Sequence, residues 1–261
     1  MKTSIKQGVL FRDLGQIEYR DAWDLQEKLL QENVQVKTEL RSMLAALESQ
    51  AETVSSRPGV IDIEDVKPST NHYLLFVEHP PVYTLGKSGA IENVLISEEE
   101  RAAKGISFYN TNRGGDITFH GKEQLVGYPI LDLEKFYTDI GKYLRNLEEV
   151  IIATMADYGL KGERSPGETG VWLDAAIPGK ERKICAMGIR CSRWITMHGF
   201  AFNVNTDLSY FDYIIPCGIQ NKQVTSLEKE LGLKLDMNEV KERVKHHFER
   251  VFDVELVNGE W

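Results

Sequence analysis

The sequence predicts an α+β fold, in which a mixed or antiparallel β-sheet is flanked by helices. The apolar residues follow helical and strand periods in the order helix, several strands, helix, several strands, helices. This order lacks the strict strand–helix–strand alternation of a doubly wound parallel sheet. The length of 261 residues fits one large domain that buries its core without disulfides or metals. We therefore expect a single domain over residues 1–261.

The first helix is predicted to begin near Asp21, since apolar residues at 22, 25, 29 and 30 fall on one face. The helical rhythm continues through Leu40, Met43, Leu44 and Leu47. Residues 48–71 are rich in Ser, Pro and acidic side chains and have no clear period. We expect a surface insertion over about residues 33–70, whose latter part is a loop.

Strand-like segments follow from residue 73 onward. Residues 116–120 alternate in polarity, with Ile117 and Phe119 on one face. A helix is then predicted from Ile140 to Tyr158, because its apolar residues recur at spacings of three and four; Gly159 stands where a C-terminal cap belongs. The strands predicted on the two sides of this helix are 73–79, 82–85, 106–110, 116–120, 170–174, 183–191 and 198–204.

Two helices are predicted near the C-terminus. Thr225 and Glu228 form a capping-box pattern that opens a short helix, which Gly232 closes. Asn238 can cap an amphipathic helix over about residues 238–252.

Composition excludes several classes of protein. Lys and Arg total 31 and Asp and Glu total 40, a formal net charge of −9, so the chain as a whole is a poor nucleic-acid binder. No apolar run approaches the ~20 residues of a membrane span, and the N-terminus lacks the apolar stretch of a signal peptide. Three cysteines without a CxxC pair exclude a disulfide scaffold, and we expect a cytoplasmic protein.

Residues 113–121, RGGDITFHG, join two adjacent glycines to charged and polar side chains. Gly114 and Gly115 allow a ligand to approach the backbone because they have no Cβ. Arg113 can hold an anion or a carbonyl group. The same pattern also fits a tight turn that enters a strand. It matches neither the Walker A loop nor the dinucleotide-binding glycine motif.

Lys183 and Cys217 are the candidate reactive side chains. Lys183 opens a predicted strand, where lysine is usually solvated, but in a pocket desolvation can make it a usable base. Cys217 stands between Pro216 and Gly218 on a bend after an apolar run, and a loop position favours access to its thiol. Cys185 and Cys191 look like core residues of the predicted strand. No pair of His120, His198 and Cys217 has metal-ligand spacing, so we expect no metal.

Seven segments in order resemble one family, the octanoyl (lipoyl) transferases, also called lipoate-biosynthesis protein B. The resemblance extends from Leu14 to Leu227, except for the predicted insertion. The matching segments are EHPPVYTLG at 78–86, RGGDITFHG at 113–121, QLVGYPILDL at 124–133, GVW at 170–172, RKICAMGIR at 182–190, RWITMHGFAFNVNTDLSYFDYIIPCGI at 193–219 and VTSL at 224–227.

The resemblance implies the fold of biotin and lipoate protein ligases and an acyl transfer without ATP or cofactor. An octanoyl group would leave the thioester of octanoyl-acyl carrier protein and form an amide on a lysine of a lipoyl domain, as in 2-oxoacid dehydrogenases and the glycine cleavage H protein. Cys217 matches the family's nucleophile, and Lys183 matches its partner. The substrate-contacting residues implied are Arg113, Gly114, Gly115, Asp116, Ile117, Thr118, Phe119, His120, Ala186, Met187, Gly188, Gly199, Phe200 and Ala201.

We call residues 113–121, RGGDITFHG, the glycine segment. The chain departs from the family pattern in this segment and just after it. The family usually has Gln where this chain has Asp116, and HGPGQ where it has residues 120–124, HGKEQ. Acyl carrier protein is acidic, as is this chain, so a local basic patch is expected to receive it. The candidates for that patch are Lys142, Arg145, Arg182, Arg190 and Arg193.

Three other readings of the sequence stay open. An ATP-dependent lipoate or biotin ligase would share the fold and a lysine like Lys183, but it would need no thiol at position 217. A module that docks lipoyl domains would have an unreactive Cys217. A thioesterase would release free octanoate whether or not a lipoyl domain was present.

Overall fold

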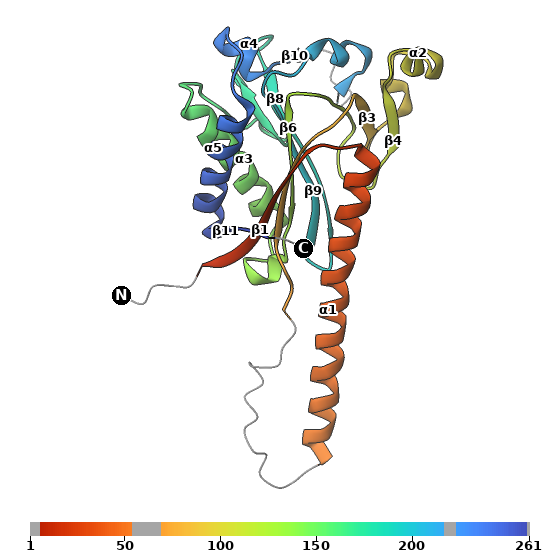
Figure 1. Ribbon diagram of the computed structural model, residues 1–261, viewed down its shortest axis with the longest axis vertical. Coiled ribbons are helices and arrows are strands. Elements are labelled where there is room, and N and C mark those ends of the chain that lie inside the picture. Colours follow the sequence, from red (N-terminus) through yellow and green to blue (C-terminus); the bar gives the residue numbers. More distant parts are fainter. Residues whose placement is uncertain (1–5, 54–68, 217–222, 260–261) are drawn as a thin grey trace.

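The computed structural model describes residues 6–53, 69–216 and 223–259. A large mixed sheet forms the centre, with helices on both of its faces and a small second sheet at one end (Figure 1). The predicted α+β class is therefore confirmed. The strands are β1 (Gln7–Gln16), β2 (Tyr73–Glu78), β3 (Val82–Leu85), β4 (Ser107–Asn110), β5 (Ile117–His120), β6 (Gln124–Ile130), β7 (Val171–Leu173), β8 (Arg182–Ser192), β9 (Ile195–Asn203), β10 (Gln223–Val224) and β11 (Val254–Asn258).

The helices differ widely in length. The α-helices are α1 (Tyr19–Thr53), α2 (Glu98–Ala103), α3 (Ile140–Ala156), α4 (Leu227–Leu231) and α5 (Met237–Phe252). The short 3-10 helices are η2 (Ile91–Asn93), η3 (Leu133–Lys135) and η4 (Leu208–Tyr213). Among the residues described, no helix is long and apolar enough to cross a membrane.

The large sheet has the strand order β10-β8-β9-β6-β2-β1-β11, and β7 pairs with β8 outside this path. Its centre, β2-β6-β9-β8, is antiparallel, whereas β1 runs parallel to both β2 and β11. Strands β1, β6, β10 and β11 were absent from the sequence prediction. In β6 the pattern is interrupted by Gly127 and Pro129, which ordinarily argue against a central strand.

Strand β2 is buried on both faces, which explains its continuous apolar sequence YLLFV. Leu74 and Phe76 face a core shared with α3 and α5. Tyr73, Leu75 and Val77 face the opposite core, which α1 covers. In Figure 1, α1 lies on one side of the sheet and α3 and α5 lie on the other.

Helix α1 corrects part of the predicted surface insertion over residues 33–70, although residues 41–46 are exposed as expected. The helix continues through Thr53, so residues 48–53 are helical rather than a loop; they include Glu, Gln and Ala, which favour helix even where no apolar period marks it. Asn33 and Lys37 are buried against the body of the protein, so this part of α1 is not a surface feature. Residues 54–68 of the predicted insertion lie outside the described residues.

The predicted helix caps near the C-terminus were wrong by one or two residues. Ser226, and not Thr225, caps α4 by accepting a hydrogen bond from the Lys229 amide, and Gly232 ends the helix in the left-handed conformation as predicted. Asp236, and not Asn238, caps α5. Neighbouring residues of equal capping ability compete, and the backbone path decides between them.

Strands β4, β3 and β5 form the small sheet, with β3 in the middle. Tyr83, Phe119 and Ile214 belong to its buried cluster. Phe119 stacks on Tyr210 with ring centroids 4.6 Å apart. This sheet therefore fixes both the glycine segment, which contains β5, and the stretch that leads to Pro216.

Candidate active site

A cavity of about 450 Å³ lies between the glycine segment and strands β6, β8 and β9. Its size is typical of a site for a small ligand. Fourteen of the predicted site residues line it: Arg113, Gly114, Gly115, Asp116, Ile117, Thr118, His120, Lys183, Ala186, Met187, Gly188, Gly199, Phe200 and Ala201. The structure thus brings together three segments that are well separated in the sequence.

Two predicted residues are not among those lining residues. The Phe119 ring packs in the buried cluster of the small sheet, on the other side of β5, because side chains alternate along a strand. Cys217 lies outside the described residues. The residue before it, Pro216, lines the cavity together with Lys183.

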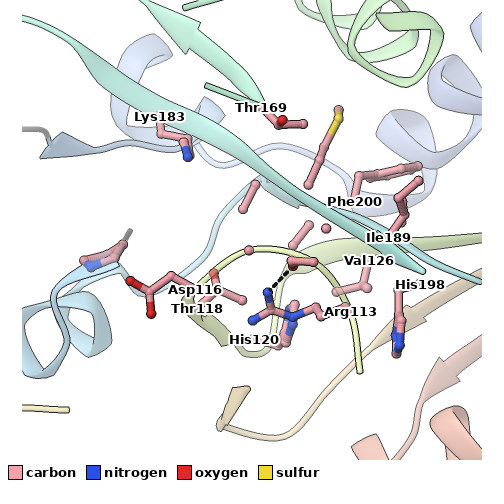
Figure 2. Close-up of a pocket in the computed structure, with 18 of the residues that line it drawn as sticks. Arg113, Asp116, Thr118, His120, Val126, Thr169, Lys183, Ile189, His198 and Phe200 are labelled. Atoms are coloured by element: carbon pink, nitrogen blue, oxygen red, sulfur yellow. Dashed lines mark hydrogen bonds between the residues drawn. The ribbon is translucent and has the colours of Figure 1, made fainter. Parts of the chain in front are cut away.

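The two ends of the cavity differ in charge (Figure 2). Lys183 and Asp116 lie toward one end, and Val126, Ile189 and Phe200 lie toward the other, together with His198. An amphiphilic ligand would place its reactive polar group near Lys183 and an apolar tail among the three apolar side chains.

Arg113 holds the glycine segment in place. Its guanidinium is buried and donates from Nε and Nη2 to Thr84 Oγ1, at 3.3 and 2.9 Å, and from Nη1 to the Gly114 carbonyl at 3.0 Å. These bonds are made within the protein itself, and the contact of Arg113 with a ligand stays a prediction. These bonds tie the segment to β3.

The glycine segment lies directly on β8. The Gly114 amide donates to the Ile189 carbonyl at 2.8 Å, and a Cβ at Gly188 would lie only 2.6 Å from the Gly114 oxygen. Gly188 therefore permits a contact that any larger residue would block. The Gly114 amide is thus already bonded within the protein.

Lys183 extends from β8 over the ring of Trp172 on β7, with its Nζ 4.5 Å from the ring centroid. The loop before β7 contributes Glu168 and Thr169 to the cavity wall. A fully buried carboxylate, Glu148 on α3, fixes this loop by accepting from the Gly170 amide at 3.0 Å. The same carboxylate bonds Arg164 Nε at 3.0 Å.

Buried histidines close the cavity on the side of α1. Burial lowers the pKa of His198 to about 3 and that of His79 to about 4. It also lowers the pKa of His120 well below its usual value, and nearby His79 and Arg113 act in the same direction. The three rings are therefore neutral at physiological pH. The two that line the cavity, His120 and His198, add no charge to its wall.

Several lining residues were missed by the sequence analysis. Strand β6 supplies Gln124, Val126 and Tyr128, because it runs beside β9 in the sheet. Helix α1 supplies Tyr19 at its first turn. Residues 124–133 were used only for the family resemblance, and nothing in the sequence placed Tyr19 here.

Three residues of the expected basic patch are paired with carboxylates. Arg145 pairs with Glu148 at 2.8 Å, Arg182 with Glu230 at 2.7 Å and Arg190 with Glu27 at 2.7 Å. Of the other two, Lys142 lies over the Tyr137 ring and Arg193 donates to Thr38 Oγ1. Over the ranges that the structure describes, no group of three or more His, Cys, Asp or Glu side chains is arranged to hold a metal ion.

Comparisons with known proteins show the family to which the chain belongs. Residues 63–249 match the model of the lipoyl protein ligase A/B catalytic domain. The chain is 55% identical over 246 residues to the octanoyltransferase of Christiangramia forsetii, covering 94% of this chain and 96% of that protein. It is 53% identical over 250 residues to the octanoyltransferase of Flavobacterium johnsoniae, covering 95% and 98%.

Solved structures share the fold at low sequence identity. The putative lipoate protein ligase Ta0514 of T. acidophilum with bound lipoic acid has a TM-score of 0.63 at 14% identity, covering 97% of this chain and 88% of that one. A lipoate-protein ligase A bound with ATP has a TM-score of 0.59 at 15% identity, covering 98% and 88%.

The fold is thus that of the lipoate-protein ligase class, as the sequence resemblance implied. Within this class, the chain belongs to the octanoyltransferase family. It is an acyltransferase.

Proposed function

We propose that this enzyme moves an octanoyl group from the thioester of acyl carrier protein to a lysine of a lipoyl domain, through a thioester on Cys217. The observation that carries the proposal is that Pro216, the neighbour of Cys217, lines the same cavity as Lys183. Lipoyl domains of 2-oxoacid dehydrogenases and the glycine cleavage H protein are the proposed acceptors. The cytoplasm is the proposed location, since Cys185 and Cys191 are both free thiols.

In the first step, the Cys217 thiolate attacks the carbonyl carbon of the carrier thioester. A new sulfur–carbon bond forms on Cys217, the old one breaks, and the carrier leaves as a thiol with the proton that the Lys183 ammonium gives up. One thioester replaces another, so this step needs no ATP. Lys183, as an ammonium group, favours the attacking thiolate by its positive charge.

In the second step, the amine of the acceptor lysine attacks the octanoyl-enzyme. The carbon–nitrogen bond of the amide forms, the bond to Cys217 breaks, and the thiolate is regenerated. Lys183, as a free amine, takes the proton that the attacking amine loses. Conversion of a thioester to an amide is downhill, which makes the transfer favourable overall.

The apolar end of the cavity accounts for the acyl chain. Val126, Ile189 and Phe200 form an apolar surface at the end away from Lys183. Burial of six CH₂ groups contributes about 5 kcal/mol. That preference favours an eight-carbon acyl group over a short one.

Substrate contacts are proposed for the glycine segment and for residues 186–188 and 199–201. These residues form the walls between the two ends of the cavity. Phe119 is withdrawn from the proposed contacts because its ring packs in the small-sheet cluster.

Mass spectrometry of the intact protein tests this proposal. The pure protein is mixed with octanoyl carrier protein in the absence of ATP. An added octanoyl mass on the peptide that holds Cys217, removed by apo lipoyl domain, is the expected result. The Cys217→Ser variant, which is nearly isosteric, should form no such adduct.

The other outcomes identify the rival functions. Octanoylation of the lipoyl domain only with ATP and free octanoate would mean a ligase. Release of free octanoate with no lipoyl domain present would mean a thioesterase. Retention of transfer by Cys217→Ser would remove the thiol from the mechanism.

A further inference from the structure

We infer that Asn93 is a positioning residue that holds the chain leading to Pro216 against Asp116 at the cavity wall. Asn93 does not line the cavity among the residues described, but it joins the two parts that must meet there. Its side-chain Nδ2 donates to Asp116 Oδ2 at 2.7 Å. Its main-chain carbonyl accepts from the Ile215 amide at 2.8 Å. The inference rests on the proposed role of Cys217.

The segment that leads to Pro216 is paired along its length with the residues around Asn93. Val94 and Ile214 form an antiparallel bridge, and the Leu95 amide donates to the Tyr213 carbonyl at 2.9 Å. Ile214 is 3% exposed and packs in the small-sheet cluster. A displacement of Asn93 would therefore displace the chain immediately before Pro216.

At the other end of the link, Asp116 belongs to the glycine segment. Its Oδ1 accepts from the Ile117 amide at 2.6 Å, and its carbonyl accepts from the Gly86 amide at 3.2 Å. The carboxylate is thus held by its own loop and offers its second oxygen to Asn93. This gives a function to the Asp that stands where the family pattern usually has Gln.

Charge makes this link stronger than a neutral amide pair. A hydrogen bond to an ionised acceptor is shorter and roughly twice as strong as a neutral one. The distance of 2.7 Å between Asn93 Nδ2 and Asp116 Oδ2 is that of such a bond. Because a misplacement of ~1 Å at a reacting group can cost ~100-fold in rate, a firm link here bears directly on thiol attack.

A charge exchange tests the inference. Asn93→Asp sets two carboxylates against each other and should lower kcat for transfer about tenfold or more. The KM for octanoyl carrier protein should stay within about twofold, since Asn93 is outside the cavity wall. Asn93→Asp combined with Asp116→Asn restores one donor and one acceptor, and should recover kcat to within about threefold of the parent.

Asn110→Asp is the matched control, because it adds the same charge at an exposed position on β4; its kcat should equal the parent's. If Asn93→Asp fails to fold, Asn93→Ala replaces it, and the rate of octanoyl-enzyme formation is measured instead. An unchanged kcat in Asn93→Asp, or a double variant no faster than the single one, would overturn the inference. Failure of the proposed function differs visibly, since the parent enzyme would then form no octanoyl adduct on Cys217.

Discussion

Lys37 Nζ lies 2.7 Å from Asp132 Oδ1, and the two side chains are only 7% and 2% exposed. The same ammonium lies 2.8 Å from Glu134 Oε2 and donates to the Arg193 carbonyl at 2.9 Å. One cation therefore fixes α1 both to the end of β6 and to the turn between β8 and β9. Beyond the sheet, the rest of α1 extends away from the body of the protein (Figure 1).

Replacement of Lys37 by Met should destabilise the protein by about 3 kcal/mol, because Asp132 is left buried without its main cation. Denaturation in urea measures the change. Lys28→Met is the control: Lys28 is 70% exposed and 3.9 Å from Glu32, so its loss should cost less than about 0.5 kcal/mol. Equal losses in the two variants would contradict the structural role of Lys37.

Replacement of Lys183 by Met should slow alkylation of Cys217 at neutral pH about tenfold, because the neighbouring positive charge that favours the thiolate is lost. Peptide mass spectrometry follows the rate at Cys217 separately from Cys185 and Cys191. Lys180→Met, an exposed change three residues earlier, is the control and should leave the rate unaltered. A Lys183→Met protein with the parental rate at every pH would take Lys183 out of its assigned role.

Gly188→Ala should reduce transfer by about tenfold or more, since its Cβ would lie 2.6 Å from the Gly114 oxygen and must push the glycine segment away from β8. Steady-state kinetics with octanoyl carrier protein measure the effect. Gly8→Ala on β1 provides the comparison, because its Cβ meets only Val257 Cγ2 at 3.9 Å. That variant should transfer at the parental rate; a similar rate for Gly188→Ala would show that the contact does not matter.

Stability should fall as the pH drops from about 6.5 toward 4. His79 donates from Nδ1 to the Ile17 carbonyl and accepts at Nε2 from the Tyr128 hydroxyl, both at 2.8 Å, so protonation would break the second bond. Burial lowers the pKa of His79 to about 4, although the bond to Ile17 opposes this. Between pH 6.5 and 4 the imidazole of His79 is therefore protonated in the unfolded chain but neutral in the folded one. The free energy of unfolding falls as the pH is lowered through this range.

His79→Gln should reduce the slope of the free energy of unfolding against pH by up to about 1.4 kcal/mol per pH unit. This is the contribution of one proton taken up on unfolding. The free energy of unfolding in urea, measured at several pH values, checks it. His246→Gln, at an exposed position of α5, should retain the parental slope. An unchanged slope in His79→Gln would mean that His79 does not titrate on unfolding in this range.

The sequence predicted best where one periodic pattern decides the structure. The spacing of apolar residues from Ile140 onward defined α3, and the apolar run after Tyr73 defined β2. It failed at β6, where Pro129 sits in a central strand, and at β1 and β11, whose pairing joins distant segments. Such pairings follow from the tertiary fold rather than from local preference.

For the site, the motif resemblance selected residues most of which line the cavity. The structure then showed which of them do not. Phe119 faces away because alternate residues of β5 face opposite sides. The link through Asn93 was invisible in the sequence, because it depends on the pairing of Val94 with Ile214. Roles for Cys217 and Lys183 stay predictions until the adduct is sought.

The parallel pairing of β1 with β11 sets Gln7 opposite Val254. On the ribosome, Val254 emerges only after all the strands from β1 to β10 have been made. Until then β1 has an open edge and can pair only with β2. Contacts of such long sequence separation slow folding, so this edge should be the last part of the sheet to form. Until it forms, the unpaired edge of β1 exposes the nascent chain to aggregation.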